Sequence, residues 1–260
     1  MGEDILMRVV RRDRLVVAGS LASISIIAWL YLLTGAGMDM DMSMDMSMVM
    51  PASWTPAYAL VVFLMWWIMM IAMMLPSAAP MILLFARVNR RSREQGNPYV
   101  PTGLFASGYL IVWGAFSLAA TLLHWLLDQA GLMSMNMSSV SIWLGAGLLI
   151  SAGIYQLTPL KYACLRHCRG PLEFVMHHWR PGYTGALNMG IRHGAYCVGC
   201  CWVVMGLLFY GGVMNFYWII GLSILVLTEK ILPAEKGFCY LTGIVFLLWG
   251  LWLAFEAATA

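Results

Sequence analysis

Cysteine, histidine and methionine gather in an apolar stretch around residue 200, and these side chains are suited to a soft metal ion. His193, Cys197, Cys201 and Met205 recur every four residues, and Cys200 lies beside them. In a helix, this spacing places an imidazole, two thiols and a thioether along one face. Cys197, Cys200 and Cys201 would form a group of three sulfur atoms, which suits Cu(I) or Zn(II). We therefore predict a metal site here.

A second group of the same kind precedes the first along the chain. Cys164 and Cys168 flank His167, and the two groups could converge on one ion. Cysteines in such tight clusters suit metal ligation better than a framework of disulfides. The remaining cysteine, Cys239, is isolated, and we interpret it as a small apolar core residue.

Methionine is unusually abundant, with 22 residues in a chain of 260. Between Met38 and Met50 it alternates mainly with aspartate and serine. A thioether is a soft, neutral ligand that selects Cu(I), so the pattern predicts a loop that collects metal. A flexible low-complexity loop is the alternative interpretation. The predicted ligands in this loop are Met38, Met40, Met42, Met44, Met46 and Met48.

A shorter methionine and serine segment covers residues 133–138, shortly after His124 and Asp128. His124 and Asp128 are four residues apart and share a helix face. His124 and Asp128 could complete an outer metal site with Met133, Met135 and Met137, or His124 could be a histidine capped by Asp128.

Other methionines follow a helical spacing inside the apolar stretch 57–85. Met65, Met69 and Met73 are each four residues apart, as are Met70 and Met74. In a helix this spacing stacks the thioethers turn upon turn, and it predicts a ladder of ligands. Methionine is also a common filler of helix-bundle cores, and that interpretation stays open.

Two features near the inner ends of apolar stretches point to sites lined by protein. Pro76 and Pro80 are expected to interrupt their helix and to free carbonyl groups. Glu229 and Lys230 are consecutive and cannot face one another on a helix, so we expect each to pair elsewhere.

Polar residues also occur between the two cysteine groups. Glu173 lies four residues before His177, and His178 follows directly. We expect this segment to form an amphipathic helix at a membrane interface. Its polar side chains could be metal ligands or a proton path, but we interpret them as solvated polar residues.

The composition indicates that membrane-spanning helices position all these residues. The chain is 62% hydrophobic and 10% charged, whereas soluble domains contain about a quarter charged residues. A span needs about 20 mainly apolar residues. We predict an all-α polytopic transmembrane bundle that forms a single domain over residues 1–260, with about seven spans, or six plus a short or re-entrant segment. The spans are 15–35, 57–85, 102–127, 140–159, 194–214, 216–232 and 238–258.

The positions of the basic residues predict the orientation. All 15 Lys and Arg lie before the first span, in alternate loops or at the end of the sixth span, on one side of the bundle. Basic loops stay in the cytoplasm, so we expect a cytoplasmic N-terminus, an outside C-terminus and a location in the plasma membrane of a bacterium. The methionine-rich loop 37–56 is then outside, and the Cys/His-rich loop 160–193 is inside, where thiols stay reduced. A net charge of +3 gives no reason to expect nucleic acid as a partner.

Three sequence blocks resemble a family of bacterial predicted metal-binding integral membrane proteins. They are WWIMMIAMMLPSAAPMILLFA from Trp66, QLTPLKYACLRHCRGP from Gln156 and GIRHGAYCVGCCWVVM from Gly190, with TEKILP from Thr228. The resemblance implies membrane location and metal binding. A looser similarity, of chemistry and not of fold, links the chain to high-affinity copper importers. These have Met-rich outer tails, a Met-x-x-x-Met pair in a membrane helix and an inner Cys/His cluster.

These patterns favour a membrane protein that captures Cu(I) and transfers or transports it. Cu(I) is expected to pass from the outer methionines along Met65, Met69 and Met73 to the inner cysteines, and copper is favoured over zinc and iron. A metallochaperone or a membrane complex would be the protein partner. The alternatives are a subunit of a membrane metalloenzyme, such as an oxidoreductase complex, or a scaffold subunit. The sequence does not decide whether the protein is an enzyme, and it assigns no catalytic residue.

Overall fold

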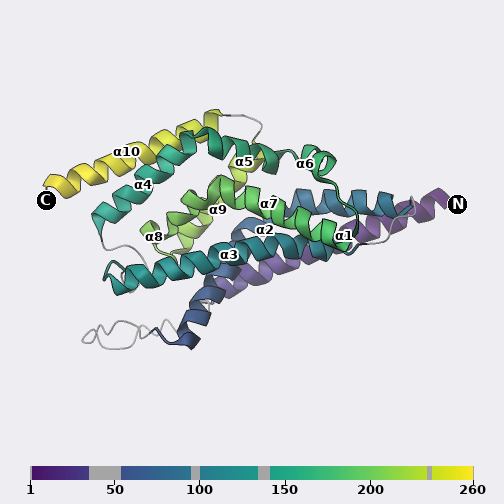
Figure 1. Cartoon of the computed structure of the whole chain (residues 1–260), viewed down its shortest axis with the longest axis horizontal. Coiled ribbons are helices and arrows are strands. Elements are labelled where there is room, and N and C mark those ends of the chain that lie inside the picture. The colour runs from purple at the N-terminus through teal and green to yellow at the C-terminus, as the bar shows by residue number, and fades with distance from the viewer. Residues whose placement is uncertain (1, 35–53, 95–99, 134–140, 233–235, 260) are drawn as a thin grey trace.

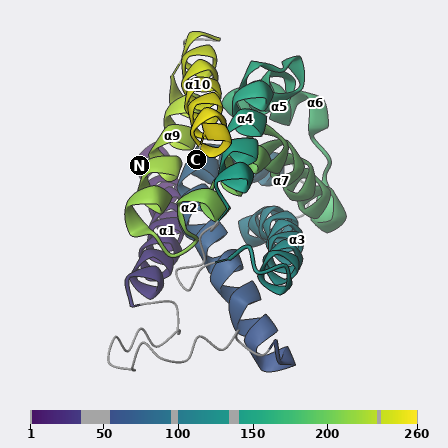
Figure 2. The ribbon, with the colours of Figure 1, turned by 90° about the vertical axis from the view of Figure 1, so that its left-hand side faces the viewer.

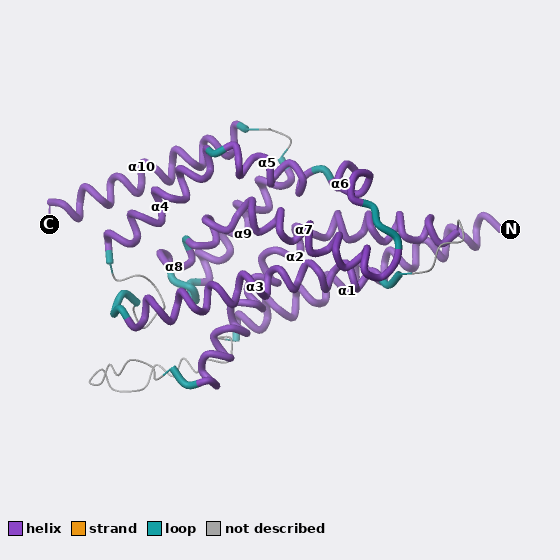
Figure 3. Tube along the Cα trace, viewed as in Figure 1, coloured by secondary structure: helices purple, strands orange, loops and turns teal. Residues whose placement is uncertain are grey.

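The computed structural model describes residues 2–34, 54–94, 100–133, 141–232 and 236–259, with side chains described from Leu15 onward. Helices form nearly all of these residues, which contain no strand (Figure 3). The helices are α1 (Gly2–Leu33), α2 (Pro56–Glu94), α3 (Thr102–Gln129), α4 (Ile142–Leu157), α5 (Pro159–Arg169), α6 (Pro171–His178), α7 (Gly182–Gly206), α8 (Leu208–Gly211), α9 (Phe216–Ile231) and α10 (Gly237–Thr259).

The long helices run side by side and reverse direction along the chain (Figure 1). The N-terminus lies at one end of this bundle and the C-terminus at the other. The short helices α5 and α6 lie toward the end that holds the N-terminus. The prediction of an all-helical bundle is confirmed.

Within the described residues, five helical segments are long and apolar enough to cross a membrane, one of them formed by α7 and α8 together, or six if the bent pair of α4 and α5 is one span. The expected sixth span, 216–232, is present as the helix α9, but it has only 16 residues. At about 1.5 Å per residue, it is shorter than the ~30 Å hydrocarbon layer of a bilayer.

Helix α2 is the central element of the core. Its side chains are buried along most of its length, including Met65, Trp66, Met69 and Met70. It packs against α1, α3 and α9. The helix continues through Pro76 and Pro80, so the expectation that these prolines interrupt it is wrong. Contacts with neighbouring helices maintain α2 despite the hydrogen bonds that proline removes.

Two helix pairs approach closely because glycines face each other. On α3 and α7, a Cβ at Gly108 would lie 2.9 Å from the Ile191 nitrogen, and one at Gly190 would overlap Phe105. On α4 and α10, a Cβ at Gly153 would lie 2.8 Å from the Gly243 oxygen. Figure 2 shows α3 beside α7 and α4 beside α10. Small residues allow such contacts between apolar helices.

A sharp bend after α4 directs the first cysteine group toward α7. Thr158 is extended and accepts a hydrogen bond from the Lys161 amide at 3.3 Å, so it caps α5. Pro159 begins α5, where its missing N–H is not needed. The two helix axes meet at 67°. This bend lays α5 against α7.

Candidate thiol-rich metal centre

The two predicted cysteine groups meet where α5 packs on α7. Cys197, Cys200 and Cys201 are buried, and Cys164 and Cys168 of α5 are half-buried. The Cys168 thiol interacts with those of Cys197 and Cys200. The fold therefore brings the two groups into contact. We call these five cysteines the thiol centre.

A glycine makes room for the closest approach between α5 and α7. A Cβ at Gly199 would lie 2.9 Å from the Cys164 sulfur, closer than side chains normally pack. The Tyr155 hydroxyl donates a hydrogen bond to the Gly199 carbonyl on the same turn of α7. Gly199 and Tyr155 thus fix where Cys164 meets the thiols of α7.

Polar side chains from two other helices contact the Cys197 sulfur. The Lys230 ammonium of α9 donates to it at 2.9 Å and to the Ser77 hydroxyl of α2 at 2.8 Å. The Tyr109 hydroxyl of α3 lies 3.2 Å from the same sulfur. The Lys230 ammonium stabilises negative charge on Cys197 at this distance, whereas the single proton of the Tyr109 hydroxyl is donated to the Met74 carbonyl. Ser77 and Tyr109 were missed in the sequence, because nothing in their own segments marks them as polar neighbours of a thiol.

The thiols of the α7 group are held by their own helix. Cys200 and Cys201 both donate to the Cys197 carbonyl, at 3.1 and 3.0 Å. In the described part of the chain, no three Cys, His, Asp or Glu side chains already surround a common point as metal ligands. Binding an ion at the thiol centre therefore requires thiols to turn away from the Cys197 carbonyl.

The histidine and thioether of the predicted α7 face lie in the core on either side of the cysteines. His193 and Met205 are buried with them. The His193 ring stacks on Tyr109 with centroids 5.7 Å apart, and its Nδ1 has no hydrogen-bond partner among the described residues. A buried polar atom without a partner is rare, and His193 therefore holds a nitrogen that a ligand could use.

The predicted methionine ladder is also in the core. Met65 and Met69 are fully buried and Met73 nearly so, and all three belong to the same core cluster as the thiol centre. The Met74 carbonyl, one residue later, accepts from the Ser77 hydroxyl and the Tyr109 hydroxyl. Tyr109 therefore links the backbone next to Met73 to the Cys197 sulfur.

At the other end of α3, His124 is buried beside aromatic rings. Its ring lies 5.8 Å from that of Trp54, and its Nδ1 has no hydrogen-bond partner among the described residues. Asp128 accepts a 2.6 Å hydrogen bond from the Trp54 indole. The predicted ligands from Met38 to Met48 lie outside the described residues, and so do Met135 and Met137 of the second segment.

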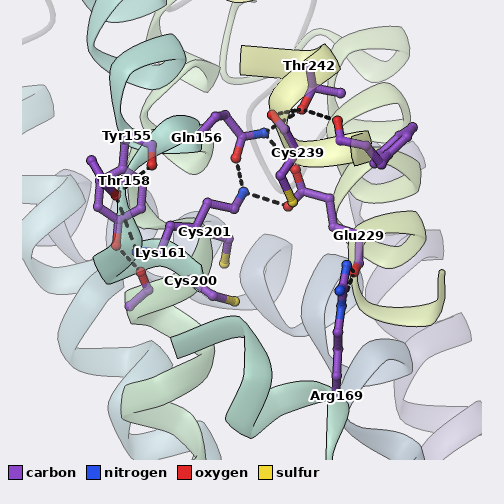
Figure 4. Close-up of polar contacts among 12 residues, drawn as sticks. Tyr155, Gln156, Thr158, Lys161, Arg169, Cys200, Cys201, Glu229, Cys239 and Thr242 are labelled. Atoms are coloured by element: carbon purple, nitrogen blue, oxygen red, sulfur yellow. Dashed lines mark hydrogen bonds and ion pairs between the residues drawn. The ribbon is translucent and has the colours of Figure 1, made fainter. Parts of the chain in front are cut away.

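A second buried polar group ties α4, α5, α9 and α10 together (Figure 4). The Lys161 ammonium pairs with the Glu229 carboxylate at 2.6 Å, and both side chains are 1% exposed. Gln156 accepts from Lys161 and donates to Glu229 at 2.6 Å and to Thr242 at 2.9 Å. The expectation that Glu229 and Lys230 pair separately is confirmed, since Lys230 contacts the thiol centre instead.

Residues of the segment between the cysteine groups form a separate surface feature. His167 turns to Tyr196, with parallel rings 4.2 Å apart, and lies near His178. Glu173 and His177 are exposed on α6. The structure thus groups His167 with the histidines of α6.

A comparison with known protein families identifies the family of this chain. A sequence model of the PpoB2 copper chaperone family matches residues 63–253. The chain belongs to this family. The match to the PpoB2 copper chaperones includes the methionine ladder, the thiol centre and the Lys161–Glu229 pair, whereas α1 and the Met38–Met50 segment precede it. No curated protein and no solved structure matches the chain.

Proposed function

We propose that this protein is an integral membrane Cu(I) chaperone that holds its cargo at the thiol centre. Five converging thiols beside a buried methionine ladder carry the proposal, because thiolates and thioethers select Cu(I) among biological metals. Membership of a copper chaperone family supports copper as the cargo.

The surface supports a location in a lipid bilayer. Large apolar side chains are exposed along α1, α3 and α10, for example Ile27, Leu122 and Leu248. Soluble monomers rarely expose continuous apolar patches beyond a few hundred Å². The basic residues favour the plasma membrane, with the N-terminus in the cytoplasm and the C-terminus outside.

The path of the ion follows from the order of the ligands. Cu(I) is collected by the outer methionines and passes His124 and the ladder of Met65, Met69 and Met73. It then reaches the thiol centre, where thiolates bind it more strongly than thioethers. A metallochaperone or a membrane complex receives it there. Increasing ligand strength drives the transfer inward without ATP.

Charge balance explains why a lysine lies at the thiol centre. Two thiolates and one Cu(I) ion carry one net negative charge, and charge in an apolar interior needs a partner. Lys230 supplies the opposite charge within 2.9 Å of the Cys197 sulfur. The protein is therefore able to bind Cu(I) without leaving uncompensated charge in the core.

The proposal is tested by metal analysis of the protein purified in detergent under reducing conditions. After loading with Cu(I) and removal of weakly bound ions, bound metals are measured by mass spectrometry. We expect near-stoichiometric copper in the wild type and a large loss in Cys197→Ser/Cys201→Ser.

The matched control is Cys239→Ser, which changes a buried cysteine of α10 outside the thiol centre. It should retain the copper of the wild type. Equal copper in all three proteins, or retention of iron or zinc instead of copper, would contradict the proposal.

A further inference from the structure

A pocket at the junction of α5 and α6 contains more imidazole groups than any function proposed above uses. It has a volume of about 290 Å³. Its lining residues are Arg166, His167, Gly170, Glu173, Phe174, His177 and His178. Three of the five histidines in the chain therefore line this one pocket.

Each of these histidines presents the same free nitrogen. Nδ1 of His167 lies 2.8 Å from the Ala163 carbonyl, that of His177 lies 2.9 Å from the Glu173 carbonyl, and that of His178 lies 3.1 Å from the Phe174 carbonyl. A carbonyl oxygen only accepts, so Nδ1 must donate in all three contacts. In a neutral ring, Nε2 then carries the lone pair. Metal-bound histidines are fixed by the same kind of hydrogen bond.

Two of the rings are also held in place by aromatic neighbours. His167 stacks on Tyr196, and His178 stacks on Phe174 with centroids 4.8 Å apart. The centroids of His167 and His178 are 6.4 Å apart. Two imidazoles on opposite sides of one ion have centroids about 6 Å apart, from metal–nitrogen bonds of about 2.0 Å plus the ring radii. The spacing of these rings is therefore compatible with a shared ion.

Glu173 supplies a negative charge, and the side chains of Glu173 and His177 are able to change conformation. Glu173 and His177 are exposed on α6, where their side chains can rotate at small expense. Glu173 adds a carboxylate to the lining of the pocket, and Arg166 adds a positive charge. Completing a ligand set requires Glu173 to turn and His177 to give up its hydrogen bond to the Glu173 carbonyl, whereas His167 and His178 keep theirs, because no three ligands yet surround one point in the described chain.

We propose that His167, His177, His178 and Glu173 form a second metal site. This site binds borderline divalent ions, and among them it binds Cu(II) most tightly. Imidazole and carboxylate ligands suit this class, and affinity among first-row divalent ions is highest for Cu(II). The site differs in chemistry from the thiol centre, which suits Cu(I). It does not depend on the proposed chaperone function.

The test uses electron paramagnetic resonance on the full chain in detergent. The thiols are first saturated with Ag(I), a soft ion that neither gives a signal nor is reduced by them. One equivalent of Cu(II) is then added. We expect a Cu(II) spectrum with nitrogen hyperfine coupling from imidazole, and an affinity at least about tenfold weaker in His177→Gln/His178→Gln.

The matched control is Met176→Gln, a polar change at an exposed position of the same helix. It should leave the Cu(II) spectrum and affinity unchanged. A spectrum without nitrogen coupling, or one that survives in His177→Gln/His178→Gln, would overturn the second site. Glu173→Gln gives a further check, with a several-fold loss of affinity expected because the negative ligand is removed.

The two proposals fail in different measurements. Cu(I) retention in the cysteine variants reports on the thiol centre alone. The difference in Cu(II) spectrum between the Ag(I)-treated wild type and His177→Gln/His178→Gln reports on the histidine pocket, because His124 and His193 are the same in both proteins. Cu(I) retention by His177→Gln/His178→Gln at the wild-type level also shows that this variant is folded.

Discussion

Two lysines lie inside the helix bundle, and their surroundings differ in one respect that matters for function. Lys161 pairs with the Glu229 carboxylate and Gln156, and all three side chains are buried. Lys230, whose neighbour on α9 is Glu229, reaches the Cys197 thiol and Ser77 instead. One ammonium therefore has a permanent anion, and the other faces a group whose proton a metal ion can replace.

This difference separates a structural site from the site of the proposed function. The Lys161–Glu229 pair joins α5 to α9, and the same α5 carries Cys164 and Cys168. The Arg169 guanidinium also donates to the Glu229 carbonyl at 2.7 Å. The pair thus fixes the helix that brings two thiols to α7, while Lys230 acts on the thiols themselves.

Removing Lys161 should cause the largest loss of stability. Lys161→Met leaves the Glu229 carboxylate buried without a counter-charge, and breaking a buried pair in this way costs about 3–5 kcal/mol. The free energy of unfolding, or the unfolding temperature in detergent, measures the effect. Lys161→Met/Glu229→Leu removes both charges and should recover most of the loss. If the single and double variants are equally unstable, the pair is not what joins α5 to α9.

Removing Lys230 should weaken copper binding with a smaller effect on the fold. Lys230→Met deletes a hydrogen bond from a charged donor, worth about 1.5–3 kcal/mol, so Cu(I) affinity should fall roughly 10- to 100-fold. Competition with a Cu(I) chelator measures this affinity. Lys230→Arg keeps the charge and should retain most of it. Unchanged affinity in Lys230→Met would remove the lysine from the binding site.

A substitution at Gly199 tests how tightly α5 packs on α7 at the thiol centre. The added Cβ of Gly199→Ala would meet the Cys164 sulfur, and overpacking of this kind costs about 1–3 kcal/mol. Gly206→Ala is the control on the same helix, because no atom lies within 4 Å of its Cβ position. Calorimetry should show a lower unfolding temperature for Gly199→Ala alone. Adding Cys164→Ala should restore it, and failure to do so would place the strain elsewhere.

The sequence predicted those parts of the site that follow a helical period. Spacing of four residues placed His193, Cys197, Cys201 and Met205 on one face, and all four are buried together. The apolar stretches predicted the helices, because a lipid-like composition leaves few other structures. The span number was less predictable, since α9 is short and α4 bends into α5.

Contacts between distant segments could not be predicted in the same way. Tyr109 reaches the Cys197 sulfur only because α3 packs beside α7. Ser77 reaches Lys230 only because α2 packs beside α9. Likewise, the 67° bend after Leu157 decides that Cys168, and not His167, faces the α7 thiols. Side-chain direction across helix pairs depends on packing, which one sequence does not encode in any short pattern.

The smallest expected change in stability tests whether the methionine ladder carries copper or only fills the core. Met69→Leu keeps the volume and should cost less than about 1.5 kcal/mol. Without the Met69 thioether, the remaining ladder residues Met65 and Met73 are about 12 Å apart along the helix, whereas neighbouring ladder residues in the wild type are about 6 Å apart. We expect Cu(I) loading of the thiol centre to become several-fold slower with no change in final stoichiometry. Met81→Leu, at another buried position of α2, should load at the wild-type rate. Equal loading rates in the two variants would leave packing as the whole role of the ladder.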